Sequence, residues 1–456
     1  MKKLLFLLFL SLPLQTFCST EDPVAKGGIL DLRKIENKEH FILKLNGEWE
    51  FYWKRMLYPH DFESGKIIPD YFGKVPSYWT DYSKWLKTEN FGYATYRLRI
   101  LLPEGFRSPV AFDLPIFDSS YDIYINGKYI DGNGKTGKSK TDSQPEYRKV
   151  FFRYTPDSDV ITLIINVSNY HHRRGGFWLP AKIGTFSLLQ KHLANSWAAN
   201  WSVISLLLGC SLLFFFFFIF SNGEIMGFFS MVSTGLALRP LFTNSFLIQS
   251  FINIPWVWLI RCEYTDLYFI LIGTSWFASK LYPSTFAKAL AWGITILSGI
   301  AFVFTVFLPV RIFSYFMLVI YPALFIVTGY LIFRSFKAAL KNSIVDTIYL
   351  IAFMLLLAGG LNDIWVALGR SGSGSGYLLT YMIVVIVIIQ ASLLIYRWIR
   401  SFRETEKLKL EMEYMNRNLE KLIDERTREL QIRNQEIEEQ NKVKVCVFTP
   451  DKPHPW

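Results

Sequence analysis

The chain has 456 residues, of which 51% are hydrophobic and 17% aromatic, and its formal net charge is +11. A soluble protein of this size would contain fewer apolar residues and spread them evenly. Here they gather between residues 198 and 398, which indicates a membrane rather than a large soluble core. Basic residues flank these segments, as contact with anionic membrane lipid favours, so nucleic acid is not an expected partner.

The four cysteines are few and widely spaced. They are Cys18, Cys210, Cys262 and Cys446, and none falls between residues 21 and 197. A domain in that interval therefore has no internal disulfide and depends on its own core. No C-x-x-C or Cys/His spacing is present, so we predict neither a metal site nor a cofactor.

Residues 1–20 predict a signal peptide. Two lysines follow the first methionine, an apolar core runs over residues 4–14, and Thr16-Phe17-Cys18 gives a small-x-small cleavage pattern. Cys18 leaves lipidation open, although the bulky Phe17 before it disfavours a lipoprotein signal. In either case the following domain is expected to be exported.

Residues 21–190 predict an all-β domain. Alternating or β-branched runs at 94–100, 110–114 and 160–167 are separated by turn residues. Asn126-Gly127 is a strong hairpin signal, because both turn positions need a positive φ. Many short strands without helical patterns between them favour a β-sandwich or jelly roll.

Three segments of this domain resemble a known module: L-N-G-E-W-E-F-Y-W at 45–53, F-D-S-S-Y-D-I-Y-I-N-G-K at 117–128 and V-S-N-Y-H-H-R-R-G-G-F at 167–177. They are similar to the galactose-binding-like jelly roll. That module lies beside the sugar-cleaving domain of β-galactosidases, and in front of bacterial seven-transmembrane receptors with diverse intracellular signalling modules. The resemblance implies an extracytoplasmic ligand, either a carbohydrate or another small molecule.

Sugar sites combine aromatic faces with planar polar groups, and several residues of this domain have that chemistry. Residues 49, 51 and 53 alternate on one strand face and are more typical of core. The loop at 171–176 is the stronger candidate, although it could equally rest on lipid or on membrane helices. The predicted ligand-binding residues are His171, His172, Arg173, Arg174, Trp178 and Trp79.

Glycoside hydrolysis needs two carboxylates across the scissile bond. Glu48 and Glu50 share one face of a predicted strand, but any i, i+2 pair does so. We therefore assign no catalytic residue and do not expect an enzyme in this chain.

Seven apolar segments of about 20 residues follow, each long enough to cross a bilayer. An exported N-terminus and seven crossings place the C-terminus in the cytoplasm, and the positions of the loop lysines and arginines agree modestly. The expected location is the inner membrane, with the β domain periplasmic or extracellular. The predicted helices lie near 198–221, 226–246, 257–279, 284–306, 312–333, 345–368 and 376–398.

Ionisable residues inside membrane helices are costly and usually functional. Arg239, Glu263, Asn362 and Asp363 share roughly one level beneath the β domain in this topology. We predict an ion-pair network of Arg239 with Glu263 or Asp363 that couples the β domain to the helices. Ordinary interfacial solvation, especially of Arg261 and Asp266, is the alternative.

Four segments resemble the helical domain of the same receptor family: G-L-A-L-R-P-L at 235–241, R-C-E-Y at 261–264, Y-P-A-L-F at 321–325 and G-G-L-N-D-I-W at 359–365. Residues 399–441 carry a heptad pattern typical of a coiled coil, which predicts a homodimer. Residues 442–456 abandon the heptad, so we expect an unstructured tail, as from a frameshift or a truncated gene. The family places a cyclase, phosphatase or kinase after this helix.

The sequence thus predicts a transmembrane sensory receptor without its own catalytic domain, which would signal through a separate cytoplasmic effector. Two alternatives stay open. One is a membrane-embedded enzyme or transporter, although few polar residues reach the middle of the predicted helices. The other is the sensor half of a receptor enzyme whose output domain is encoded downstream.

Overall fold

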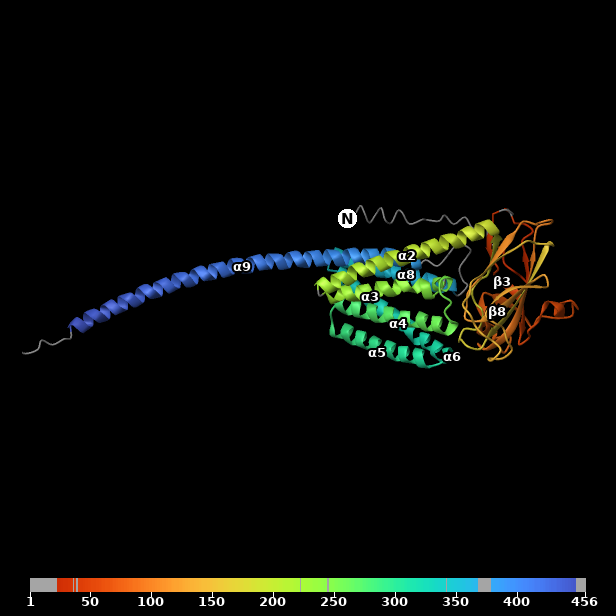
Figure 1. The fold of residues 1–456 in the computed structure, drawn as a ribbon, viewed down its shortest axis with the longest axis horizontal. Helices are drawn as coiled ribbons and strands as arrows, with labels where there is room; N and C mark the ends of the chain where they lie inside the picture. The colour runs from red at the N-terminus through yellow and green to blue at the C-terminus, as the bar shows by residue number, and fades with distance from the viewer. Residues whose placement is uncertain are drawn as a thin grey trace, which may run out of the picture. The chain divides into compact units, whose positions relative to one another are not determined.

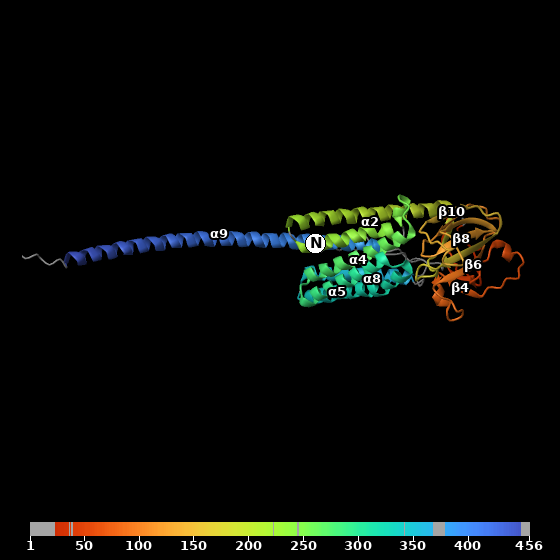
Figure 2. The ribbon, with the colours of Figure 1, turned by 60° about the horizontal axis from the view of Figure 1, so that its bottom comes forward.

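The computed structural model describes residues 23–447 apart from residues 36, 38–39, 222, 244–245, 342 and 368–378. The predicted signal peptide, Cys18 and the last nine residues lie outside the described residues. The chain divides into two compact units at Gln390 and Ala391. The first contains a β domain followed by membrane-type helices (Figures 1 and 2), and the second consists of a single long helix.

The β domain is built on a mixed sheet of seven strands. Six of its strands lie side by side in the order β4-β3-β6-β11-β8-β9. The short β1 pairs in parallel with the C-terminal end of β6. The central strand β11 is antiparallel to both of its neighbours. The strands are β1 (Ile29–Asp31), β3 (Gly47–Trp53), β4 (Tyr71–Val75), β6 (Gly92–Leu101), β8 (Ser120–Ile125), β9 (Lys128–Asn133) and β11 (Val160–Asn169).

A second sheet of four strands has the order β10-β7-β13-β2, and a third pairs β12 with β5. One continuous core takes buried side chains from both larger sheets, for example Trp49 and Phe112, which places them face to face. The strands are β2 (Ile42–Lys44), β5 (Ser77–Tyr78), β7 (Val110–Leu114), β10 (Val150–Tyr154), β12 (Gly176–Phe177) and β13 (Lys182–Thr185); η1 (Pro59–Phe62) and η2 (Trp79–Tyr82) are short 3-10 turns.

The predicted strands and hairpin are confirmed. The run at 110–114 coincides with β7, and those at 94–100 and 160–167 lie within β6 and β11. Asn126 and Gly127 join β8 to β9 with φ values of 44° and 87°, the positive values that a two-residue hairpin turn needs.

Six described helices or helix runs are long and apolar enough to cross a membrane, so the chain is a multi-pass membrane protein. The helices are α2 (Phe186–Ser221), α3 (Glu224–Phe242), α4 (Trp256–Leu281), α5 (Thr285–Phe307), α6 (Val310–Phe313), α7 (Met317–Ala339), α8 (Ile344–Ala367) and α9 (Leu379–Val447), with the 3-10 turns η3 (Leu247–Ser250) and η4 (Ser314–Phe316). α6, η4 and α7 together, residues 310–339, make up one of the six candidate membrane spans.

The third predicted span, α4, is long enough but less apolar than the other six, so the number seven stays a prediction. This helix packs against α3, α5 and α7. More of its side chains are buried by protein than those of the other helices, including the polar Asp266 and Ser275. A helix shielded by its neighbours faces little lipid, and it can therefore carry polar groups that a lipid-facing helix could not.

The β domain passes into the helices without a linker. Strand β13 ends at Thr185, and α2 begins at Phe186, well before the predicted start at 198. The Phe186 ring lies 6.1 Å from that of Phe151 and 5.2 Å from the guanidinium carbon of Arg153, both on β10. The first residue of α2 is thus part of the β-domain packing.

Beyond Gln390, α9 continues as a helix to Val447, which is past the predicted end at 441. The predicted heptad positions from Leu408 to Ile437 are all exposed on this helix. Ion pairs one turn apart, such as Arg400 with Glu404, lie along its charged surface.

The β core generates a first prediction. Phe112 is fully buried and stacks on Phe152 at 5.3 Å. Replacing it with alanine leaves a cavity and should cost about 3–5 kcal/mol, lowering the thermal unfolding midpoint of the β domain in the detergent-solubilised full-length protein. Val160→Ala is the control, since Val160 is 38% exposed. Equal shifts in the two variants would contradict the assignment of Phe112 to the core.

Candidate functional site between the β domain and the helices

The loop after β11 lies where the β domain meets the helices. Asn169, the last residue of β11, fixes this loop: its Nδ2 donates to the carbonyls of Asn90 (2.8 Å) and His172 (2.7 Å), and its Oδ1 accepts from the His172 amide (3.2 Å). The backbone at Gly175 passes so close to Asn90 that only glycine fits, because a Cβ there would lie 2.1 Å from the Asn90 carbonyl oxygen. The loop conformation is therefore set within the β domain.

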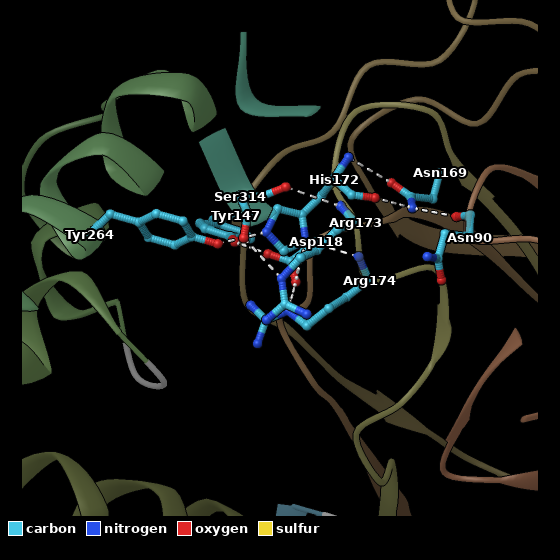
Figure 3. A network of polar contacts seen from close by, with 9 residues as sticks. All are labelled: Asn90, Asp118, Tyr147, Asn169, His172, Arg173, Arg174, Tyr264 and Ser314. Atoms are coloured by element: carbon cyan, nitrogen blue, oxygen red, sulfur yellow. Dashed lines mark hydrogen bonds and ion pairs between the residues drawn. The ribbon is translucent and has the colours of Figure 1, made fainter. Parts of the chain in front are cut away.

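His172 connects the two parts of the unit. Its side chain is fully buried, with Nδ1 3.0 Å from Oδ2 of Asp118 and Nε2 2.9 Å from the hydroxyl of Tyr264 on α4. Figure 3 shows the ring between these two partners. Nδ1 also accepts a hydrogen bond from the backbone N–H of Arg174 (3.3 Å), so three polar groups meet at this ring.

Asp118 is the charged centre of this cluster. It lies between β7 and β8, and its Oδ1 accepts a hydrogen bond from the Tyr147 hydroxyl. Its Oδ2 lies 2.8 Å from Nε of Arg174. Burial alone would raise the pKa of Asp118, but the Arg174 guanidinium, His172 and the Tyr147 hydroxyl together outweigh it and hold that pKa well below its usual range. Asp118 is therefore ionised and paired at neutral pH.

The pKa of His172 is lowered from its usual value of 6.5. Removal of the ring from water is the main cause, and the charge of Asp118 only partly opposes it. The ring is thus neutral at neutral pH.

Two further loop residues contact the helices. Arg173 donates through Nε to the carbonyl of Ser314 (2.9 Å), at the start of the 310–339 span. The His171 ring lies 6.1 Å from that of Trp256 at the start of α4, and its Nε2 lies 3.0 Å from the carbonyl of Ser143. This loop therefore rests on the helices, the alternative that its sequence left open.

The two predicted tryptophans have different environments. Trp79 is fully buried, donates from Nε1 to the hydroxyl of Tyr96 (2.9 Å) and belongs to the β core. Trp178 is partly buried, stacks on Tyr78 at 5.7 Å and lies 4.4 Å beneath the guanidinium of Arg174. Only Trp178 joins the loop residues at the boundary.

Among the predicted coupling residues, Arg239 lies beside an aspartate of α4. Its Nη1 lies 3.6 Å from Oδ2 of Asp266, and the expected pairing with Glu263 or Asp363 stays a prediction. Glu263 and Asp266 are three residues apart on α4 and share a face, and the rotation of α4 relative to α3 decides which of them Arg239 meets. Asn362 donates to Asp363 (3.1 Å).

A cavity of about 290 Å³ lies between this cluster and the helices. The β domain contributes Asp118, Tyr147, Arg174 and Trp178 to its wall. The helices contribute charged residues and several apolar side chains, among them Arg239, Glu263, Leu207, Leu236 and Pro240. The cavity thus brings together two predicted ligand-binding residues, Arg174 and Trp178, and three predicted coupling residues, Arg239, Glu263 and Asp363. Within the described residues, no group of three or more His, Cys, Asp or Glu side chains could hold a metal ion.

Four residues of the site were not predicted: Asp118, Tyr147, Tyr264 and Ser314. Asp118 and Tyr264 fall inside segments that resemble the receptor family, F-D-S-S-Y and R-C-E-Y, which is the signal that could have singled them out. Tyr147 and Ser314 carry no such signal, because their roles depend on contacts distant in the sequence.

In sequence comparisons, no family model matches the chain and no curated protein is detectably similar. Among solved structures, a β-glucuronidase of Ruminococcus gnavus is similar to 33% of this chain at 15% identity, with a TM-score of 0.25 over 28% of its own length. A GH2 β-galacturonidase of Eisenbergiella tayi is similar to 33% of this chain at 12% identity, with a TM-score of 0.23 over 26% of its own length. β-Glucuronidase 2 of Bacteroides uniformis is similar to 32% of this chain at 20% identity, with a TM-score of 0.24 over 18% of its own length. The chain spans less than a third of the length of these proteins, and a likeness at this level assigns no activity to it.

The lowered pKa of His172 predicts a pH dependence. Its folded pKa lies below its unfolded value of about 6.5, so the unfolded state binds more protons and stability falls as pH drops below 6.5. We expect the thermal unfolding midpoint of the full-length protein to fall between pH 7.5 and pH 5, and to fall less steeply in His172→Phe. His60→Gln is the control, since its ring is 72% exposed. Parallel pH profiles for the wild type and His172→Phe would show that this ring does not titrate on unfolding.

Proposed function

We propose that this chain is the sensing and membrane-spanning part of a bacterial receptor. In this proposal the β domain lies outside the inner membrane and receives a carbohydrate or other small ligand. The helices carry the resulting change to α9 in the cytoplasm. The resemblance of the sequence to seven-transmembrane receptors with diverse intracellular signalling modules supports the same assignment, with α4 as the seventh span.

The observation that carries the proposal is the buried contact of His172 with both Asp118 and Tyr264. A receptor needs a physical connection through which the sensing domain can bias the arrangement of its membrane helices. A buried polar contact suits this role because it has a definite geometry and is costly to leave unsatisfied. Shifting the loop would break it or move α4.

Helix α4 provides a path from this contact to the other end of the helices. Tyr264 and Tyr282 are separated by 18 residues (282 minus 264), about 27 Å along an α-helix. The hydroxyl of Tyr282, just after α4, donates to Asp346 on α8 (2.9 Å) and is hydrogen-bonded to the hydroxyl of Ser335 on α7 (3.0 Å). A displacement of α4 would therefore reach α7 and α8.

The output side of the proposal is a homodimer. Leu408, Met412, Met415, Leu419 and Leu422 form an exposed apolar stripe on α9 with heptad spacing, and a second copy of this helix would bury it. A separate cytoplasmic effector would then sense the dimer, and the chain itself would catalyse no reaction.

The dimer can be tested by replacing one stripe residue. Leu419→Lys places a charge where two helices would meet and should shift the full-length protein in detergent toward monomer, as measured by light scattering coupled to size-exclusion chromatography. Leu410→Lys is the matched control, because Leu410 is equally exposed, at 63%, but lies off the stripe. An unchanged dimer fraction in Leu419→Lys would contradict pairing through this face.

The receptor role can be tested at the boundary contact. Tyr264→Phe removes only the hydroxyl that is hydrogen-bonded to His172 and should change the arrangement of α9. The readout is the rate of disulfide cross-linking between copies carrying Leu422→Cys, with the native cysteines replaced by serine, in native membranes. We expect a change of about fivefold or more, the scale of allosteric coupling.

Tyr268→Phe is the control for that experiment. It removes a hydroxyl of the same helix one turn later, which bonds to Thr305 of α5 rather than to the β domain. An identical cross-linking rate in the wild type and Tyr264→Phe would show that the contact holds the fold together without passing a signal.

A further inference from the structure

The cavity between the β domain and the helices contains an unpaired carboxylate. Glu263 on α4 is largely buried and lines this space. No hydrogen bond or ion pair joins its side chain to any other residue in the described part of the chain. A charge removed from water is costly unless it is compensated, so this arrangement points to a partner that the chain does not supply.

The other charges around the cavity are already matched. Arg174 is paired with Asp118, and Arg239 lies 3.6 Å from Asp266. Asp363 accepts from Asn362 and from the amide of Leu379. Glu263 is thus left, among the described residues of this wall, as a carboxylate with neither a hydrogen bond nor an ion pair, and a cationic group such as an ammonium would stabilise its charged form.

Two residues that line the cavity carry a donor without a hydrogen-bond acceptor in the described part of the chain. Nη1 of Arg239 and the indole Nε1 of Trp178 are buried without a hydrogen-bond acceptor among the described residues, and both residues line the cavity. Arg174 uses only its Nε toward Asp118. Guanidinium and indole N–H groups together suit a carboxylate, which accepts several hydrogen bonds.

Part of the remaining wall is apolar. Val203 and Leu207 of α2, Leu236 of α3 and Phe246 lie beside the charged groups. The volume of about 290 Å³ is at the lower end for small-molecule pockets, roughly 300–1,000 Å³. The occupant should therefore be small and carry an apolar group as well as its charges.

We propose that this cavity binds a free α-amino acid with an apolar side chain. Its ammonium group would meet Glu263, its carboxylate would meet Arg239, Trp178 and Arg174, and its side chain would lie against the apolar wall. Because the β domain and the helices both line the cavity, the bound molecule would hold them together. This inference rests on the proposed receptor function only for the signalling role of that molecule.

The test uses the full-length protein in lipid nanodiscs and free leucine as the probe, measured by titration calorimetry. We expect saturable binding at one site per chain. Glu263→Gln and Arg239→Gln should each weaken it about tenfold or more, since each removes a charge-assisted contact. Glu224→Gln is the control, because Glu224 pairs with Lys280 away from the cavity. Unfolding temperatures of all three variants show whether each still folds.

Two analogues separate the two halves of the site. Isopentylamine lacks the carboxylate and 4-methylpentanoate lacks the ammonium, and both should bind at least about tenfold more weakly than leucine. Equal binding of either analogue would overturn the amino-acid assignment. So would unchanged affinity in a folded Glu263→Gln variant, or no binding of leucine, valine or phenylalanine.

Failure of this inference and failure of the receptor proposal give different results. If no amino acid binds but Tyr264→Phe changes cross-linking at residue 422, the receptor proposal stands and the cavity assignment falls. If leucine binds at Glu263 and Tyr264→Phe leaves cross-linking unchanged, the site stands and its signalling role falls.

Discussion

The boundary between the β domain and the helices depends on one buried charge. Asp118 has left water, and an isolated carboxylate in such a place would be strongly destabilising. Arg174, His172 and Tyr147 compensate it, and all three belong to the β domain. The domain therefore satisfies its own buried charge and leaves Nε2 of His172 for a contact with α4. The hydroxyl of Tyr264 makes this contact, so α4 does not need to bring a second buried charge to His172.

The arrangement explains why a loop rich in histidine and arginine suggested a ligand site. Planar donors beside aromatic rings suit a sugar, but they suit a buried contact between two parts of a protein equally well. Arg173 reaches the Ser314 carbonyl, and His171 lies beside Trp256. These groups are occupied by the protein itself, and the unsatisfied groups lie deeper, around Glu263.

Local patterns in the sequence were sufficient to place most of the fold. Strand β7 and the turn at Asn126 and Gly127 follow from alternation and turn chemistry, which involve neighbouring residues only. Helix ends such as Phe307 follow from the length of an apolar run. The partner of Arg239 could not be found in this way, because hydropathy does not fix the rotation of α4 that brings Asp266 forward. Asp118 was equally hidden, since one buried carboxylate has no periodic signature.

The direct passage from β13 into α2 limits how the β domain can move. Phe186 packs against Arg153 and Phe151, so the beginning of α2 is fixed to the sheet. The loop contact with Tyr264 is a second attachment, non-covalent and on a different helix. Arg173 adds a third attachment, at Ser314 of the 310–339 span. A tilt of the β domain about the start of α2 would therefore break these contacts or displace α4 and the 310–339 span relative to α2.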